Sequence, residues 1–595
     1  MSVDTVFPFA SRRSVVYGTN GMVASSQPLA TQAGIDILKK GGNAADAAIA
    51  VSAALGVTEP ASTGIGGDAV YMFYNARTRK VTGINGTGRA PAAITAKYLR
   101  EQVGIEHPSL PEHSIHAITV PGAAAAWVDT VEHHGSGRLD MAAILESSIN
   151  LAENGFPVSY ISAGMWEVQI DITKKMSGPE SPLLLDGTRA PAEGELMRFP
   201  DLADTYKAIA AQGKDGFYKG RIADAIVNAI KSRGGLMTQQ DLASHTSEFI
   251  NEPISMDYHD KTIWEMPPNT QGITTLIALG IIKALEEEHG LEISKLEHNS
   301  AEYLHVIIEV MRLAFADARY YVSDPQVMAD AVPTKKLLSK AYLSERARLV
   351  DMKKRNNTVQ KGYPERNSDT VYFSVVDAEG NACSALNSTF SVFGSKVVPD
   401  KCGFPLHNRG CTFVLDESLP NCIGPRKRPH HTLIPSMVTR KTTNGDHELA
   451  ACLGIMGGYV QPQGQLQFIM SLMHFLANPQ HAVDVPRICV APPRTKENTP
   501  NFELTPNARI FLDLTSSIVC VEEGIPQKVI DELEAMGHVC EVIGGHERAF
   551  FGRGQIILVK RDRSTGQQIL AGGSDPRGDG HAVGISGSVS RPSKL

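Results

Sequence analysis

The sequence predicts a layered α/β (α+β) protein, because helical patterns dominate its first two-thirds and strand patterns its last third. Between residues 124 and 350, apolar residues recur at helical spacing, for example over 273–288 and 301–319. After residue 370, short runs rich in β-branched and apolar residues follow, as in 555–559. We therefore expect helices that pack against sheets within one body.

Two helices and a strand are predicted near the N-terminus. Leu29–Lys40 carries apolar residues at helical spacing and is ended by a glycine pair. Asn43 then stands where it can cap a second helix, Ala44–Leu55. Because this second helix consists almost entirely of small and aliphatic residues, it should be buried on all sides. A glycine-rich turn leads from there into a strand over 69–74.

Composition excludes several classes of function. The chain has 595 residues, 42% hydrophobic and 20% charged, with a net charge of −7 and no basic block. Binding to nucleic acids or to membrane surfaces is therefore not expected. Residues 1–13 lack the pattern of a secretory signal, and no run of 18 apolar residues occurs. The expected location is cytoplasmic.

The cysteines give no indication of a metal or a disulfide framework. All eight follow residue 382, and none shows CxxC spacing. A chain of this length does not need disulfides, so we expect reduced, buried thiols. The pair His430–His431 does not have the spacing of a metalloprotease helix. We therefore expect neither a metal nor a cofactor.

Thr370 is the strongest candidate for chemistry. It precedes the apolar run 371–376, and a turn over 378–381 leads into a second strand pattern, as in a hairpin. If the chain were cut between Asp369 and Thr370, the threonine would carry both a nucleophilic hydroxyl and a free amine as its base. The polar stretch 353–368 reads as an exposed linker that would permit such a cut. The alternative is an ordinary threonine at a strand edge.

Linked motifs in a fixed order resemble those of the γ-glutamyltranspeptidase family. The resemblance runs from about residue 14 to about residue 585. It is carried by Gly21–Ala30, Gly41–Ala48, Glu59–Asp68, Ser374–Asp377, Gly380-Asn381, Phe393–Ser395, Lys427–Pro429, Met456–Gly458 and Gly573–Arg577. Several motifs in the correct order are far more specific than any one of them.

The resemblance implies a fold and a maturation step. The fold would be the N-terminal-nucleophile hydrolase αββα four-layer sandwich. Self-cleavage between Asp369 and Thr370 would give segments 1–369 and 370–595, interwoven as a heterodimer and possibly dimerised further. The Ser/Gly-rich tail, 584–595, is expected to be disordered.

The resemblance also assigns roles around the nucleophile. Gly457 and Gly458 match the family's oxyanion-binding glycines, and glycine permits close approach of backbone N–H groups. Ser388 matches a hydroxyl that hydrogen-bonds the nucleophile. A plain glycine turn and a surface turn are the alternatives for these positions.

The substrate pocket departs from the family pattern. The family's arginine ahead of Ala-Pro is Thr87 here, with Arg89 two residues later, and its ammonium-binding carboxylate is Thr412. The remaining candidates for substrate binding are Phe390, Arg409, His431 and Thr432. A pocket of cationic and neutral donors suits a carboxylate that lacks an α-amine. Arg89 in a surface or fold-stabilising salt bridge and His431 as a structural histidine are the alternatives.

These observations leave several functions open. The protein would cleave a small-molecule amide through an acyl-enzyme, as a γ-glutamyl or glutathione-type hydrolase or transferase, or on a related small acyl amide. Oxamate-type, cephalosporin-acylase-like and C–C-cleaving activities are alternatives within the family. A non-catalytic scaffold paralogue is the alternative of another class. No lid tyrosine is evident over 398–402, which favours an open site or hydrolysis.

Overall fold

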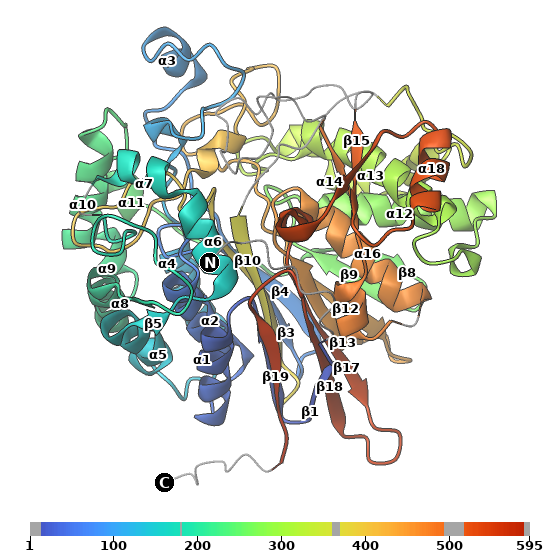
Figure 1. The fold of residues 1–595 in the computed structure, drawn as a ribbon, viewed down its shortest axis with the longest axis horizontal. Helices are drawn as coiled ribbons and strands as arrows, with labels where there is room; N and C mark the ends of the chain where they lie inside the picture. The colour runs from blue at the N-terminus through green and yellow to red at the C-terminus, as the bar shows by residue number, and fades with distance from the viewer. Residues whose placement is uncertain (1–12, 179–180, 360–368, 476, 493–516, 588–595) are drawn as a thin grey trace.

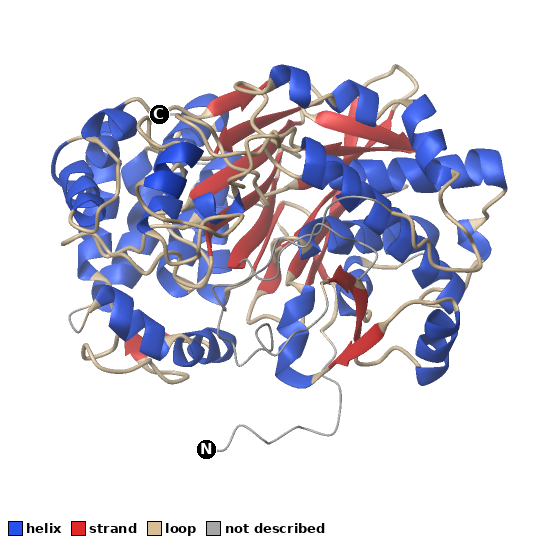
Figure 2. Cartoon of the chain, turned by 90° about the horizontal axis from the view of Figure 1, so that it is seen from above, coloured by secondary structure: helices blue, strands red, loops and turns tan. Residues whose placement is uncertain are grey.

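In the computed structural model, two seven-stranded antiparallel sheets face each other between two layers of helices (Figures 1 and 2). The structure describes residues 13–178, 181–359, 369–475, 477–492 and 517–587. This arrangement confirms the expected αββα sandwich. The fold matters for function because residues far apart in the sequence meet between the two sheets.

The first sheet contains the candidate nucleophile in its middle. Its order is β19, β2, β10, β11, β3, β4 and β7. The strands are β19 (His581–Ile585), β2 (Gly21–Ser25), β10 (Asp369–Asp377), β11 (Ala382–Phe390), β3 (Asp68–Asn75), β4 (Lys80–Gly86) and β7 (Glu248–Ile250). The hairpin β10–β11 therefore lies between two strands from the N-terminal part of the chain.

The second sheet mixes both parts of the chain in the same way. Its order is β1, β18, β17, β13, β12, β9 and β8. The strands are β1 (Val16–Gly18), β18 (Gln568–Ser574), β17 (Gly554–Arg561), β13 (His447–Ile455), β12 (Ser436–Lys441), β9 (Lys261–Glu265) and β8 (Ile254–Tyr258). Strands β10 and β11 pack against β13 across the interface between the sheets.

The helices before residue 245 belong to the side of the first sheet, and α1, α2 and α4 contact its strands. Helix α2 begins after Asn43, whose side chain accepts hydrogen bonds from the N–H groups of Ala45 and Asp46, as the sequence predicted. The helices are α1 (Pro28–Lys39), α2 (Ala44–Thr58), α3 (Ala96–Glu101), α4 (Ala123–His134), α5 (Met141–Asn154), α6 (Tyr160–Val168), α7 (Ile170–Ser177), α8 (Pro200–Gln212), α9 (Asp215–Tyr218), α10 (Gly220–Lys231) and α11 (Gln239–Ala243). All of α2 is buried, as its composition predicted.

The later helices cover the second sheet. They are α12 (Gly272–His289), α13 (Ala301–Tyr321), α14 (Thr334–Leu337), α15 (Lys340–Ala347), α16 (Val460–His474), α17 (Pro479–Asp484) and α18 (Gln527–Ala535). Smaller sheets are formed by β14 (Ile488–Ala491), β15 (Ile518–Glu522) and β16 (Cys540–Ile543), and by β5 (Phe156–Pro157) and β6 (Leu196–Met197). Among the described residues, no helix combines the length and the apolarity needed to cross a bilayer.

Three details differ from the sequence predictions. The stretch 124–350, expected to be helical, also supplies β7, β8 and β9. The described part of the expected linker is not uniformly exposed, because Arg355 and Val359 are buried. The tail begins later than residue 584, since β19 pairs with β2 through Ile585. Residues 360–368 and 588–595 lie outside the described residues. All eight cysteines are free, and most are buried, as expected.

Candidate active site

Thr370 lies beside a bulge between β10 and β11. Asp369 pairs with Phe390 and Val371 with Asn387, so the single residue Thr370 faces both Ser388 and Thr389. The Thr370 side chain is completely buried, and its hydroxyl donates to Ser388 Oγ at 3.1 Å. Bulges re-aim side chains next to functional sites, and this one brings two hydroxyl groups together.

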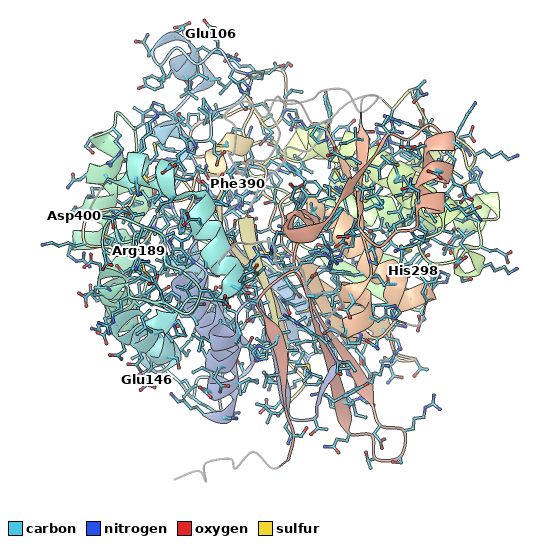
Figure 3. All side chains as sticks on the ribbon, viewed as in Figure 1. Glu106, Glu146, Arg189, His298, Phe390 and Asp400 are labelled. Atoms are coloured by element: carbon cyan, nitrogen blue, oxygen red, sulfur yellow. The ribbon has the colours of Figure 1, made fainter. Side chains whose placement is uncertain are left out.

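Local contacts explain why the chain bulges here. Phe390, labelled in Figure 3, has a left-handed backbone with φ of 76°, which is strained for a large residue. Its N–H group donates to Ser388 Oγ at 2.9 Å, which holds this conformation. On the other side, a Cβ on Gly67 would lie 2.1 Å from the Ser388 carbonyl oxygen. Gly67 therefore permits the close approach of its turn to β11.

The neighbouring Asn387 ties the hairpin to the helices. Its Oδ1 accepts from Trp127 Nε1 at 3.0 Å and from Ser52 Oγ at 3.1 Å. Its Nδ2 donates to the Gly64 carbonyl at 3.0 Å. These buried bonds fix the register of β11, and therefore the position of Ser388 relative to Thr370.

Arg409 brings a buried positive charge to the same place. It begins the short helix η4 (Arg409–Thr412) and is completely buried. Its Nη1 donates to Thr432 Oγ1 at 2.8 Å, its Nη2 to Ser388 Oγ at 3.4 Å, and its guanidinium lies 4.4 Å from the centre of the Phe390 ring. Burial lowers the pKa of Arg409 to about 10. Within the described residues no carboxylate pairs with it, and its Nε has no hydrogen-bond partner.

His431 belongs to a different cluster, built around Asp68 at the start of β3. The Leu433 N–H donates to His431 Nδ1 at 3.2 Å, so the proton lies on Nε2, which donates to Asp68 Oδ2 at 3.0 Å. His407 Nδ1 lies 3.4 Å from the same oxygen. Burial lowers the pKa of His431 to about 3, with Arg409 acting in the same direction. The ring is therefore neutral and both of its nitrogens are occupied.

The Asp68 carboxylate is correspondingly ionised. Its Oδ1 accepts from the N–H groups of Gly88 and Gly122 at 2.9 and 3.2 Å. Burial alone would raise the pKa of Asp68, but His407 and His431 hold it well below the ordinary value. Asp68 ends the sequence motif Glu59–Asp68. Its hydrogen-bond partners could not be predicted from that motif, because they lie 20 to 363 positions away in the chain.

Two other predicted pocket residues do not point at Thr370. The Arg89 guanidinium donates to Gln326, and burial together with the Arg428 charge lowers its pKa. The partner of Arg89 is therefore a neutral amide, neither Thr370 nor a carboxylate. The Thr412 hydroxyl contacts the carbonyl oxygens of Arg409 and His430 at 2.9 and 2.7 Å. It therefore forms part of a wall beside Arg409 rather than a ligand for an ammonium group.

Gly457 and Gly458 lie in the turn between β13 and α16. Their φ angles are 114° and 56°, which other residues rarely adopt. In the described structure neither N–H group has an intramolecular acceptor, and Gln271 Nε2 holds the Gly458 carbonyl at 2.9 Å. Gly454, three residues before Gly457, packs on the ring of Tyr372. Tyr372 follows Thr370 by two residues on β10. The two sheets are thus in contact directly beside both features.

A cleft that was not predicted from the sequence adjoins the turn at Gly457 and Gly458. It is lined by Gln271, Phe315, Ala318, Arg319, Thr412, Val414, Leu419, Asn421, His430 and Tyr459. Tyr459 directly follows Gly458, and Gln271 bonds that glycine. The lining comes from four distant segments, so no local pattern in the sequence could reveal it.

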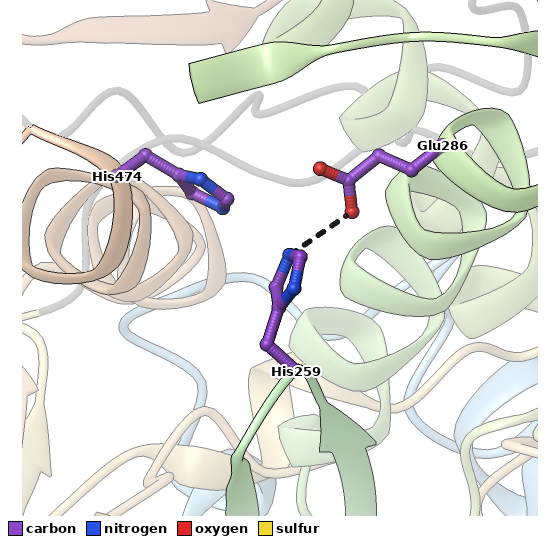
Figure 4. Close-up of side chains that lie close together, drawn as sticks. All are labelled: His259, Glu286 and His474. Carbon is purple, nitrogen blue, oxygen red and sulfur yellow. Dashed lines mark ion pairs between the residues drawn. The ribbon is translucent and has the colours of Figure 1, made fainter.

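A group of possible metal ligands lies elsewhere (Figure 4). Within the described residues, one ligand atom from each of His259, Glu286 and His474 lies within 4.8 Å of the others. His259 Nε2 is 3.4 Å from Glu286 Oε2, and the Tyr258 hydroxyl is 2.8 Å from His474 Nε2. The group sits at the β8 edge of the second sheet, whereas Thr370 is in the middle of the first. It takes no part in the chemistry argued below.

Comparison with known proteins agrees with this geometry. The γ-glutamyltranspeptidase family model matches residues 30–585. The glutathione hydrolase-like YwrD proenzyme of Bacillus subtilis (strain 168) is 35% identical over 570 residues, 96% of this chain and 99% of that protein. The oxamate amidohydrolase proenzyme of Klebsiella pneumoniae (strain ATCC 700721 / MGH 78578) is 28% identical, over 95% of this chain and 98% of its own.

A solved structure is similar over its full length. The cephalosporin acylase from Bacillus halodurans matches with a TM-score of 0.83 and 38% identity, covering 99% of this chain and 100% of that one. The family model and these relatives all span Thr370 and the glycine turn. The chain belongs to the γ-glutamyltranspeptidase family and is an enzyme of the N-terminal-nucleophile hydrolase type.

Proposed function

We propose that Thr370 is the nucleophile of an amidohydrolase and becomes the N-terminus when the protein cleaves its own Asp369–Thr370 bond. The buried hydroxyl pair of Thr370 and Ser388 supports this role. The free N–H groups of Gly457 and Gly458 and the proenzyme relatives support it further. Segments 1–369 and 370–595 then remain together as a heterodimer.

Self-cleavage would use the same atoms as catalysis. Thr370 Oγ attacks the Asp369 carbonyl carbon, the C–N bond breaks, and the nitrogen takes up a proton. The product is an ester between Asp369 and the Thr370 side chain. Water hydrolyses this ester, which leaves a carboxylate on Asp369 and a free amine on Thr370.

Substrate turnover repeats this chemistry on a small amide. The Thr370 amine accepts the hydroxyl proton while Oγ attacks the substrate carbonyl. The N–H groups of Gly457 and Gly458 stabilise the oxyanion. The amine half leaves with the proton, and an acyl ester remains on Thr370. Water, or another amine in a transfer reaction, releases the acyl group.

Our proposal for the class of substrate rests on Arg409. It is a fully buried cation that contacts Ser388, its Nε has no hydrogen-bond partner, and among the described residues no carboxylate forms an ion pair with it, although the charge of Asp68 acts on it. A carboxylate is the natural partner for a guanidinium. We assign the acyl group as one that ends in a carboxylate and has no α-ammonium, as in a monoamide of a dicarboxylic acid. Phe390 and Thr432 hold Arg409 in position.

A γ-glutamyl amide is the second candidate. The similarity to the glutathione hydrolase-like protein of Bacillus subtilis favours it. An α-ammonium group, however, would meet the Thr412 hydroxyl, which is already occupied by backbone carbonyls. Losing a charge-assisted hydrogen bond costs about 1.5–3 kcal/mol, so γ-glutamyl amides should be the poorer substrates.

Intact mass under denaturing conditions tests the first step. We expect fragments that meet at Asp369/Thr370 in the wild-type protein and one uncut chain in Thr370→Ala. Purified enzyme is then assayed with glutaryl-4-nitroanilide, γ-glutamyl-4-nitroanilide and oxamate. Faster release of nitroaniline from the glutaryl amide supports the first candidate, and the reverse order supports the second. A single uncut chain with no activity on any amide would support the scaffold alternative.

A further inference from the structure

Within the described part of the chain, one guanidinium nitrogen in the cleft beside Gly458 has no hydrogen-bond partner. Arg319 lies near the end of α13, and its Nη2 is buried. No described residue forms a hydrogen bond or ion pair with this nitrogen. A buried guanidinium nitrogen left without an acceptor costs free energy, which a bound anion would recover.

The described residues that line the cleft carry no negative charge that would compete for Arg319. The residues that line the cleft include no aspartate or glutamate. His430 Nδ1, which is also buried, has no partner in the described structure, and the His430 ring stacks on Tyr459 with centroids 5.6 Å apart. Burial, and then the charges of Arg319 and Arg409, lower the pKa of His430 to about 3. A neutral imidazole beside a guanidinium can donate to an oxyanion without adding charge.

The volume of the cleft and its apolar walls restrict the chemical class of ligand that can bind there. The cleft leaves about 20 Å³ in which a water-sized group can be centred, enough for one small polar group. Phe315, Ala318, Val414 and Leu419 supply apolar walls. A carboxylate attached to an apolar or aromatic body fits this combination better than a free inorganic anion.

We propose that this cleft is the subsite for a carboxylate on the amine half of the substrate, with Arg319 as its ligand. The inference rests on the proposed function, because it assigns one side of the scissile amide. The Thr412 hydroxyl contacts the carbonyls of both Arg409 and His430, so it stands between the Arg409 pocket and the Arg319 cleft.

The position of Gly457 and Gly458 indicates which half of the substrate lies toward Arg409 and which half lies toward the Arg319 cleft. In the proposed reaction the scissile carbonyl lies between Thr370 Oγ and the N–H groups of Gly457 and Gly458. Its two substituents point in different directions. The acyl chain runs toward Arg409, which contacts Ser388, and the amine runs toward Tyr459, which follows Gly458. The substrates would therefore be amides with a carboxylate at each end.

Two chromogenic substrates with one acyl group test this assignment. Glutaryl-3-carboxy-4-nitroanilide carries a carboxylate on its leaving amine, and glutaryl-4-nitroanilide does not. We expect Arg319→Gln to raise KM for the first about tenfold and to change KM for the second less than about twofold, because one charge-assisted bond is lost. Arg319→Lys should restore part of the difference. The exposed Arg563→Gln is the matched control for lost charge and should affect neither substrate.

Equal changes in KM for both anilides would mean that Arg319 acts on the acyl half or on folding, and would overturn the proposal. An unchanged KM for both anilides would overturn it as well. If the wild-type enzyme cleaves neither anilide, the proposed function fails, but the subsite is still testable. Calorimetric titration with 5-amino-2-nitrobenzoate should then show binding that Arg319→Gln abolishes, with 4-nitroaniline as the uncharged control. Equal affinity in both proteins would overturn the subsite itself.

Discussion

Two buried polar clusters lie close to Thr370, and they differ in how completely the hydrogen-bonding positions of their charged groups are filled. In the Asp68 cluster (Asp68, His407 and His431), the carboxylate accepts three hydrogen bonds and has a second imidazole beside it. In the Arg409 cluster (Arg409, Ser388 and Phe390), the guanidinium forms no ion pair with a described carboxylate, although the charge of Asp68 acts on it, and its Nε has no hydrogen-bond partner. A buried charge whose hydrogen-bonding positions are filled is suited to a structural role, whereas one with an unfilled position is suited to a ligand.

The largest effect is expected from breaking the closed cluster. Asp68→Asn places an amide NH₂ group or a neutral oxygen where His431 Nε2–H now meets a carboxylate. The Asp68 carboxylate accepts three buried hydrogen bonds, and each hydrogen bond to a charged group contributes about 1.5–3 kcal/mol, so the loss should exceed that from any single bond. Urea denaturation in a Thr370→Ala background, where the chain is uncut, should show this loss in the free energy of unfolding. The exposed Asp330→Asn is the control, and a similar stability for both variants would show that the cluster is not a structural anchor.

The open cluster should respond in activity instead. Arg409→Gln is expected to lower kcat/KM for glutaryl-4-nitroanilide about 100-fold, equivalent to about 2.7 kcal/mol, because the acyl carboxylate loses its cation. Butyryl-4-nitroanilide, which has no carboxylate, should lose much less. Steady-state kinetics with both anilides decides the matter. Equal losses for the two substrates would mean that Arg409 acts through Ser388 alone.

Ser388→Ala tests a second residue of the Arg409 cluster, and its expected effect is smaller. The variant removes the acceptor for the Thr370 hydroxyl and for the Phe390 N–H group. Losing a hydrogen bond of this kind costs about 1 kcal/mol, so self-cleavage should slow by about fivefold. A time course of intact mass measures the rate. Cleavage at the wild-type rate would remove Ser388 from the mechanism, and Ser388→Thr, which keeps the hydroxyl, is the control.

The smallest effect is a change in pH dependence. The pKa of His431 is about 3 in the folded protein and about 6.5 in an unfolded chain, so between these values the unfolded state binds more protons. Stability from this group is therefore present above pH 6.5 and is lost as the pH falls toward 3. His431 should contribute about 1 kcal/mol of destabilisation between pH 6.5 and 5.5. His431→Asn, which can still donate to Asp68 but does not titrate, should show a shallower decline in urea denaturation at these two pH values, and an unchanged slope would contradict the assignment.

The parts of the fold that depend on neighbouring residues could be predicted from the sequence. The start of α2 follows from Asn43 and Asp46, three residues apart, and the complete burial of that helix follows from its composition. The strands β7, β8 and β9 were missed because they are short and interrupt a long helical stretch. Their pairing depends on partners elsewhere in the chain rather than on their own pattern.

The candidate site divides in the same way. Thr370 could be identified because a hydroxyl residue before a hairpin has a chemical meaning of its own. The bulge that sets Ser388 opposite Thr370 depends on Gly67, more than 300 positions earlier, so only the fold reveals it. Arg319 had no motif at all, since its importance comes from what surrounds it in space. His431 was predicted as a pocket residue, and its hydrogen bond to Asp68, 363 positions earlier in the chain, could not be read from the sequence.

The alternation of early and late strands in both sheets has a consequence for the life of the molecule. Strands β10 and β11 lie between β2 and β3, while β12 lies between β9 and β13. A cut before Thr370 would leave two chains that share every layer, so neither would have a complete sheet alone. The order of events would then run one way, with assembly while the chain is continuous and scission afterwards. A mature molecule that unfolds would face a search between two separate polypeptides, and its durability would be governed by the rate of opening rather than by a reversible balance.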